Sequence, residues 1–293
     1  MTKCNLCPRG CGIDRDEYKG RCGVGSTVKV ARASLHMWEE PCISGDRGSG
    51  TVFFAGCSLG CVYCQNRAIS KGDSGKEITI SRLGEIFIEQ QARGAANINL
   101  VTGDHYILQI AEALDMVKHK LHIPVVFNTS SYVTTSALKQ LSGYVDIYLA
   151  DYKYHIPEVG ERYSRAADYP AVARSAIAEM YSQCGEPVFD SEGYMTKGVI
   201  VRHLVLPGNL LNSKQSLRYL HDTYGDSIYI SIMSQYTPCT DLEEYPEINR
   251  KLTWAEYERI VNFAEDIGIR KAYIQEGDSA EESFIPPFDN EGV

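Results

Sequence analysis

From residue 51 to about residue 275, short runs rich in β-branched and aromatic residues alternate with longer amphipathic patterns, and this alternation limits the possible folds most strongly. Strands that alternate with helices pair in parallel, because each helix returns the chain to the same end of the sheet. The sequence therefore predicts an α/β fold, a parallel sheet with helices outside it. The expected strands are 52–55, 98–101, 125–128, 145–149, 199–206, 228–232 and 272–274.

The segments between these runs place apolar residues on one face at helical spacing. Ser81 is expected to cap the first helix and Gly94 to end it. Core packing explains every apolar stripe without a functional role. Ligands of α/β folds bind at the carboxyl ends of the strands, so residues that follow strands are candidates for chemistry. The helical segments begin at Ser81 and at Ile107, and then cover 171–180, 214–224 and 253–267.

Three cysteines follow the first expected strand at the spacing C-x3-C-x2-C, namely Cys57, Cys61 and Cys64. Three thiolates on one loop can bind three irons of a 4Fe–4S cubane and leave the fourth iron without a protein ligand. An open metal position is where a substrate or cofactor binds, so this spacing indicates catalysis. The alternative is a set of buried or zinc-binding thiols, but a closed zinc site requires four ligands, usually in two close pairs.

A second group of cysteines precedes this loop at the spacing C-x2-C-x3-C-x10-C. Four thiols within 19 residues are enough for a closed tetrahedral site. A second 4Fe–4S cluster and a structural zinc ion both remain possible fillings. Cys42 could complete or perturb this site, whereas Cys184 and Cys239 are expected to be ordinary buried thiols. The group consists of Cys4, Cys7, Cys11 and Cys22.

The composition is that of an ordinary globular protein, with 23% charged and 44% hydrophobic residues. A net charge of −9 argues against binding to DNA or RNA. No apolar stretch is long enough to span a membrane, and no secretory signal is visible. Ten cysteines without an export signal favour a reducing, cytoplasmic location over a disulfide framework.

The chain is expected to have three parts. Residues 1–50 form a cysteine-rich segment with one or two short strands between Ser26 and Leu35, beside a metal site. Residues 51–275 form the α/β domain. Residues 276–293 form an acidic tail containing Pro286 and Pro287, for which a flexible end and a strap are both open.

The cysteine loop, with Tyr63 before its third cysteine, resembles the signature of radical S-adenosylmethionine (SAM) enzymes. The continuation into Gln65 and Asn66 and the run Arg202–Gly208 resemble the branch of proteins similar to pyruvate formate-lyase activating enzyme. The likeness extends over the segments 4–9, 38–41 and 145–149. It implies an open, partial (β/α)6 TIM-type barrel that binds a 4Fe–4S cluster through the three cysteines, together with SAM.

The resemblance also implies contacts to SAM after the second and third strands. Thr102 and Gly103 would bind through their backbone, and Asp104 would accept a hydrogen bond from the SAM ammonium group. This segment has fewer glycines than the family pattern, and a polar loop is the alternative. Asn128 and Thr129 would lie near the SAM ribose.

Further contacts are implied after the fourth strand and on the fifth. Asp151 would accept from the ribose hydroxyls, and Lys153 would pair with the SAM carboxylate, unless the two form only a surface ion pair. Arg202 is costly within an apolar strand without a partner, and the resemblance makes the SAM carboxylate that partner. His203 is expected to be structural. Tyr106 and Tyr236 are candidates for the pocket wall.

Together these features predict a radical SAM oxidoreductase that cleaves SAM reductively and abstracts a hydrogen atom through a 5′-deoxyadenosyl radical. The resemblance implies a flavodoxin or ferredoxin as electron donor and a glycyl-radical enzyme as the target. A small metabolite or peptide is the alternative substrate. A non-enzymatic iron–sulfur electron carrier is the remaining alternative, although such carriers normally give every iron a protein ligand.

Overall fold

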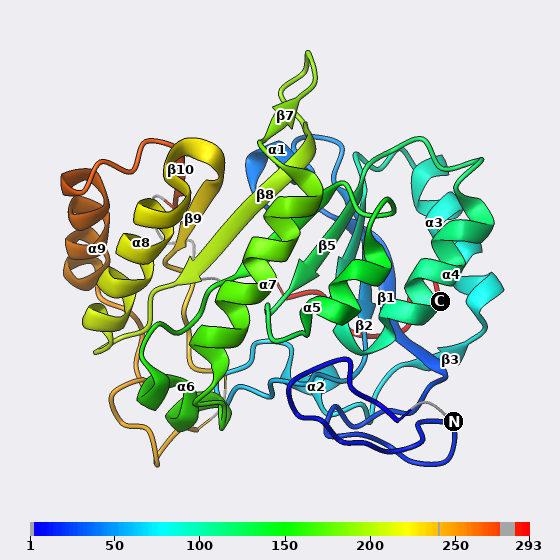
Figure 1. Cartoon of the computed structure of the whole chain (residues 1–293), viewed down its shortest axis with the longest axis horizontal. Coiled ribbons are helices and arrows are strands. Elements are labelled where there is room, and N and C mark those ends of the chain that lie inside the picture. Colours follow the sequence, from blue (N-terminus) through cyan, green and yellow to red (C-terminus); the bar gives the residue numbers. More distant parts are fainter. Residues whose placement is uncertain (1–2, 240, 276–284) are drawn as a thin grey trace.

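One mixed sheet forms the centre of the protein in the computed structural model, which describes residues 3–239, 241–275 and 285–293 (Figure 1). Its strand order is β10-β9-β8-β6-β5-β4-β2-β1-β3, and each neighbouring pair from β2 to β10 is parallel. The strands are β1 Val28–His36, β2 Ser49–Phe54, β3 Lys76–Ile78, β4 Ile98–Val101, β5 Val125–Thr129, β6 Ile147–Asp151, β7 Val188–Phe189, β8 Met195–Leu204, β9 Tyr229–Met233 and β10 Ala272–Ile274.

Helices connect the parallel strands and pack on the outside of the curved sheet, as Figure 1 shows for α3, α4, α7, α8 and α9. This arrangement confirms the predicted α/β fold and is consistent with a partial TIM-type barrel. The helices are α1 Pro41–Ser44, α2 Arg67–Ser70, α3 Ile80–Ala92, α4 Ile107–Val117, α5 Thr135–Leu138, α6 Pro157–Ser164, α7 Tyr169–Cys184, α8 Leu210–Tyr224 and α9 Trp254–Asp266.

Two local predictions about the elements are corrected. The cap of α3 is Thr79, whose side chain accepts a hydrogen bond from the backbone N–H of Arg82, so Ser81 lies inside the helix. Strand β8 covers Met195–Leu204 and is displaced toward the N-terminus from the predicted range. Its register pairs Arg202 with Asp151, which is the last residue of β6. The two charged residues therefore lie side by side on neighbouring strands.

The cysteine-rich segment contributes a strand to the central sheet. β1 is antiparallel to β2, and its nine residues exceed the short strands that were expected. Residues 285–293 run along β1: Asn290 N–H donates to Ala31 O at 3.0 Å, and Ala33 N–H donates to Glu291 O at 2.8 Å. The predicted acidic tail also covers residues 276–284, which lie outside the described residues.

Among the helices of the described residues, none is both long and apolar enough to cross a membrane.

Candidate active site

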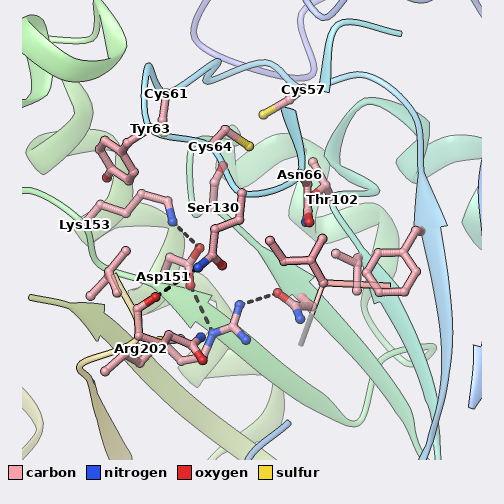
Figure 2. Close-up of a pocket in the computed structure, with 18 of the residues that line it drawn as sticks. Cys57, Cys61, Tyr63, Cys64, Asn66, Thr102, Ser130, Asp151, Lys153 and Arg202 are labelled. Carbon is pink, nitrogen blue, oxygen red and sulfur yellow. Dashed lines mark hydrogen bonds and ion pairs between the residues drawn. The ribbon is translucent and has the colours of Figure 1, made fainter. Parts of the chain in front are cut away.

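A pocket at the carboxyl ends of the parallel strands contains most of the predicted site residues. Figure 2 shows the cysteines on one side and Arg202 on the other, with Lys153 and Asp151 between them. The carboxyl ends of parallel strands meet at this edge, which explains why residues far apart in the sequence converge here. The predicted residues in the lining are Cys57, Cys61, Tyr63, Cys64, Thr102, Asn128, Thr129, Asp151, Lys153 and Arg202.

The cysteine loop between β2 and α2 presents its three thiols to this pocket. Burial raises the pKa of Cys57 to about 12 and that of Cys64 to about 11. A bound metal would deprotonate such thiols through its own charge. Among the described residues, no three His, Cys, Asp or Glu side chains converge as the ligands of a single ion do. A cubane binds each thiolate through a different iron, so its ligands need not converge in that way.

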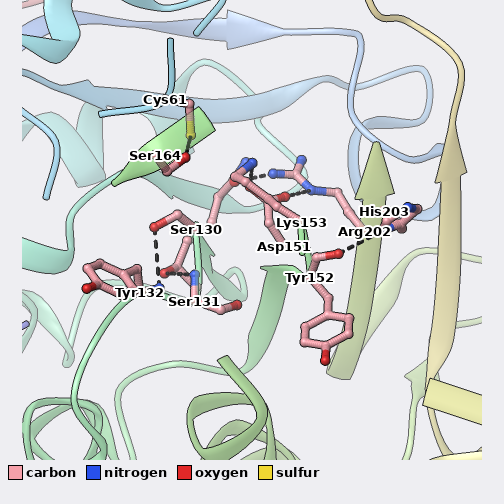
Figure 3. Close-up of polar contacts among 12 residues, drawn as sticks. Cys61, Ser130, Ser131, Tyr132, Asp151, Tyr152, Lys153, Ser164, Arg202 and His203 are labelled. Atoms are coloured by element: carbon pink, nitrogen blue, oxygen red, sulfur yellow. Dashed lines mark hydrogen bonds and ion pairs between the residues drawn. The ribbon is translucent and has the colours of Figure 1, made fainter. Parts of the chain in front are cut away.

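A chain of hydroxyl groups leads to one of these thiols. The Ser164 hydroxyl donates to Cys61 Sγ at 3.1 Å (Figure 3). The Tyr154 hydroxyl lies 2.8 Å from Ser164 Oγ. Tyr154 also lies 2.7 Å from the hydroxyl of Tyr63. Hydrogen bonds to a sulfur ligand stabilise its negative charge and thereby influence the potential of a cluster bound to it.

A network of buried charges forms the opposite wall. Arg202 Nε donates to Asp151 Oδ1 at 3.1 Å, and Lys153 Nζ donates to Asp151 Oδ2 at 2.6 Å. Burial alone would raise the pKa of Asp151, but the ion pairs with Lys153 and Arg202 outweigh it and lower the pKa. The side chains of these residues are only 12–18% exposed, so the alternative of an idle surface pair does not describe them.

Glu39, which is not among the predicted site residues, belongs to the same network. Its carboxylate accepts from Arg202 Nη1 at 3.2 Å and from Asn99 Nδ2 at 2.9 Å. Burial raises the pKa of Glu39 although Arg202 opposes the rise. Arg202 thus contacts two carboxylates. The expected partner of Arg202 was the SAM carboxylate, and nothing in the sequence periodicity located a protein carboxylate for it in the segment before α1.

The strand end after β4 has an unusual backbone. Thr102 has a φ of +58°, which is rare for a β-branched residue, and its N–H donates to Asn128 O at 2.9 Å. Strained residues of this kind cluster at functional sites. Gly103 and Asp104, in contrast, are not in the pocket lining. A Cβ on Gly103 would lie 2.6 Å from Ile110 Cδ1, so this glycine permits the close packing of α4.

Asp104 lies behind the pocket wall. Its carboxylate accepts a hydrogen bond from the Thr129 hydroxyl, and burial raises the pKa of Asp104 to about 6. Thr129 itself and the neighbouring Ser130 line the pocket. The contact of Asp104 with a SAM ammonium group therefore stays a prediction, which the geometry of the side chain does not support directly.

Comparison with known proteins places this geometry in a family. Residues 51–171, which contain the cysteine loop and the first four parallel strands, match the model of the Radical SAM superfamily. The chain is 30% identical over 283 residues to the uncharacterized protein MJ0674 of Methanocaldococcus jannaschii, a match that covers 93% of this chain and 77% of that protein. The chain belongs to the radical SAM superfamily.

Solved structures agree with this membership at the level of the fold. Streptococcus suis SuiB has a TM-score of 0.52 at 12% identity, over 76% of this chain and 47% of SuiB. The FeFe-hydrogenase maturase HydG from Carboxydothermus hydrogenoformans has a TM-score of 0.50 at 14% identity, over 80% of this chain and 55% of HydG. The radical SAM chain thus spans about half the length of these proteins, and the likeness shows the fold alone.

Membership in the radical SAM superfamily implies a 4Fe–4S cluster and SAM, and the donors of this pocket fit both groups. Three thiols on one loop can ligate three irons and leave one open. The wall facing them offers carboxylate, ammonium, guanidinium and amide groups, which suit the hydroxyls, ammonium and carboxylate of SAM.

Other predicted residues of this radical SAM protein have mixed outcomes. His203 is structural as expected: its ring contacts Tyr152 O at 2.7 Å and Ser213 Oγ at 2.9 Å, and burial lowers its pKa to about 4. Tyr236 lines the pocket. Tyr106 does not line the pocket. Its ring lies under the guanidinium of Arg15, whose Cζ is 5.5 Å from the ring centroid.

The remaining cysteines differ in position. Cys184 is buried as predicted, but Cys239 lines the pocket because it follows β9 at the carboxyl edge. Cys42 packs with Ile43 and Val126 in a separate apolar cluster, so the structure does not place it with the N-terminal group. The predicted members of that group do lie near one another: burial raises the pKa of Cys7 to about 11, and the neighbouring thiols of Cys11, Cys4 and Cys22 add to the rise.

Proposed function

We propose that this protein is an enzyme that cleaves SAM reductively at a 4Fe–4S cluster and abstracts a hydrogen atom from its substrate. The observation that carries the proposal is the convergence of Cys57, Cys61 and Cys64 with the Asp151–Lys153–Arg202 network in one pocket. Cys57, Cys61 and Cys64 would hold the cluster, which, once reduced, would supply the electron for cleavage of SAM to methionine and a 5′-deoxyadenosyl radical.

The protein side chains would bind and orient the cofactor. Asp151, whose lowered pKa keeps it ionised, would accept hydrogen bonds from the ribose hydroxyls. Lys153 and Arg202 would supply positive charge for the SAM carboxylate. Tyr63 would support the cluster loop through its hydroxyl contact with Tyr154.

Two substrate classes follow from different observations. The resemblance to pyruvate formate-lyase activating enzyme supports a glycine of a glycyl-radical enzyme as the hydrogen donor. The wall of the pocket supports a small metabolite or peptide as the second candidate, because Ile285 and Pro286 of the C-terminal segment line it. That segment is attached to β1 through Arg32, which forms ion pairs with Asp289 and Glu291, and it narrows the space available to a protein loop.

The remaining assignments rest on the sequence. A flavodoxin or ferredoxin would supply the electron to this oxidoreductase, and the ten cysteines support a reducing, cytoplasmic compartment. Cys4, Cys7, Cys11 and Cys22 would hold a second 4Fe–4S cluster or a zinc ion.

The test is anaerobic reconstitution with iron and sulfide, followed by reduction with dithionite in the presence of SAM. We expect 5′-deoxyadenosine, measured by mass spectrometry, from the wild type and none from Cys61→Ala. Iron and zinc are counted per chain, which separates two clusters from one cluster plus zinc. Addition of a candidate glycyl-radical enzyme or a metabolite mixture then separates the substrate classes. A fully loaded protein that neither binds nor cleaves SAM would instead be an iron–sulfur electron carrier.

A further inference from the structure

Arg9 lies between two cysteines of the N-terminal group, yet its side chain reaches the cysteine loop of the barrel. Its guanidinium donates from Nε to Ser58 O at 3.1 Å and from Nη2 to Leu59 O at 3.2 Å. The same group also donates to Ser164 O at 2.8 Å and to Arg165 O. A planar guanidinium with five N–H donors can hold several carbonyls at once in a fixed geometry, which lysine cannot do.

The carbonyls that Arg9 binds belong to the surroundings of the proposed cluster. Ser58 and Leu59 lie between the first and second cysteines of the loop. Ser164 is the last residue of α6, and its hydroxyl donates to Cys61 Sγ (Figure 3). Arg9 therefore fixes both the loop that carries the cluster ligands and the residue that hydrogen-bonds one of them.

A second contact joins the two cysteine groups through their backbones. The N–H of Cys57 donates to Cys22 O at 3.2 Å. The approach is close: a Cβ on Gly56, whose φ is +93°, would lie 2.7 Å from the same carbonyl oxygen. Glycine is therefore required at this position. The last cysteine of the N-terminal group thus lies directly against the first cysteine of the barrel loop.

The segment that carries Arg9 is held by turns and by a few buried residues, such as Cys22 and Val24, that pack against the core. Residues 3–27, all of them described, contain no helix or strand. The turns are closed by backbone hydrogen bonds such as Cys4 N–H to Ile13 O at 2.9 Å and Gly12 N–H to Cys4 O at 3.1 Å. In a segment without regular secondary structure, a thiolate-bound metal adds order to the turns that carry its ligands. Cys7 and Cys11 flank Arg9 by two residues on each side, so a metal on these thiols would fix its position.

We propose that the Cys4, Cys7, Cys11 and Cys22 site binds a thiolate-held metal centre whose occupancy positions the cluster loop of the barrel through Arg9. This inference rests on the proposed function, because the loop in question is the one assigned to the SAM-binding cluster. Arg9 is a positioning residue in this account, since it contacts the loop and not the substrate. The described thiols do not converge on a single ion, which favours a second cluster over zinc, and the metal count distinguishes the two.

The test follows the SAM-responsive electron paramagnetic resonance signal of the reduced protein, which only a cluster with an open iron produces. In Arg9→Met we expect this signal to decay about 10- to 100-fold faster during incubation with a chelator. We also expect its reduction potential to become more negative, because a positive charge near the cluster is lost. Arg9→Lys should restore the potential but not the slow decay. Arg21→Met, which removes an exposed arginine of the same segment, is the matched control.

A double-mutant cycle decides whether Arg9 and the metal act together. Cys7→Ala should reproduce the fast decay of Arg9→Met, and the combination should be no worse than either single change. If Arg9→Met does not fold, the cycle is run with Arg9→Lys. Additive effects, or a decay in the Arg9 variants equal to that of Arg21→Met, would overturn the inference alone. A loaded wild type without a SAM-responsive signal would overturn both this inference and the proposed function.

Discussion

The two cysteine groups use the same side chain but differ in what the thiols face. The loop of Cys57, Cys61 and Cys64 opens on a pocket whose opposite wall carries a network of buried charges. The N-terminal group lies in a segment of turns, with three of its four cysteines half-buried, and this segment contacts the barrel through Arg9 and the carbonyl of Cys22. The comparison shows that spacing identifies a metal site, whereas the groups that share its cavity determine whether a cofactor can bind there.

The largest expected difference between the groups concerns SAM cleavage. Cys64→Ala removes a ligand of the open cluster and should lower the yield of 5′-deoxyadenosine by more than about 100-fold. Cys4→Ala acts only through the position of the barrel cysteine loop and should lower this yield by about 10-fold. Mass spectrometry of reconstituted, iron-quantified samples measures both. Equal losses of 5′-deoxyadenosine in the two variants would show that the N-terminal group takes part in the reaction itself. The two cysteine groups would then no longer differ in function.

Substitution of Arg202 tests the role of the buried charge network, which faces the barrel cysteines and not the N-terminal group. Arg202→Met leaves Asp151 and Glu39 without their shared partner and should lower the free energy of unfolding by about 3–5 kcal/mol, with a loss of SAM affinity. Arg32→Met also removes an arginine from two carboxylates, but Asp289 and Glu291 are half exposed, so the loss should be about 1 kcal/mol or less. Urea unfolding and calorimetric SAM titration measure these effects.

A rescue variant makes the Arg202 prediction specific. Asp151 keeps its ion pair with Lys153 in Arg202→Met, whereas Glu39 loses its cationic partner. Addition of Glu39→Gln to Arg202→Met removes that carboxylate charge and should recover part of the lost stability without recovering SAM affinity. No recovery would mean that Glu39 is not a partner of Arg202 in solution.

These variants also separate what the sequence predicts from what it does not. Runs of β-branched and aromatic residues and the helical patterns between them located the parallel strands, whose ends share one edge. The family resemblance then selected Asp151, Lys153 and Arg202 at those strand ends. Glu39, Arg9 and Ser164 were not found. Glu39 and Arg9 come from a segment without periodicity, and Ser164 ends a helix that the patterns did not indicate. Their partners are set by tertiary packing, which local patterns do not contain.

Substitution of Asp104 tests whether this buried carboxylate belongs to the cofactor-binding residues of the barrel site. Its folded pKa of about 6 lies above its ordinary value of 3.8, so the native state binds the proton more tightly, and the contribution of Asp104 to the free energy of unfolding should fall as the pH rises from about 4 to 6. Asp104→Asn should abolish this fall and stabilise the protein at pH 7 by about 1–3 kcal/mol. Urea unfolding at pH 4.5 and pH 7 measures it.

The same variant distinguishes burial from cofactor binding. We expect SAM affinity to change little in Asp104→Asn, because the side chain lies behind the pocket wall. A large loss of SAM affinity without stabilisation would show that Asp104 binds the SAM ammonium group, as the family resemblance implies.

The smallest expected effect concerns the hydroxyl that reaches Cys61. Ser164→Ala removes one hydrogen bond to the sulfur and should make the potential of the SAM-responsive cluster slightly more negative, with an approximately 2- to 10-fold change in the rate of 5′-deoxyadenosine formation. Potentiometric titration monitored by electron paramagnetic resonance measures the shift. Ser175→Ala, on the exposed face of α7, is the matched control. An unchanged potential would remove Ser164 from the account of cluster tuning.

The most direct test of the central claim is the electron paramagnetic resonance spectrum of the reduced, reconstituted wild type recorded with and without SAM. If Cys57, Cys61 and Cys64 hold a cluster with one open iron, SAM will change the signal, and the SAM-sensitive signal will be absent from Cys57→Ala but present in Cys4→Ala. A fully loaded wild-type protein whose spectrum is the same with and without SAM would contradict the account.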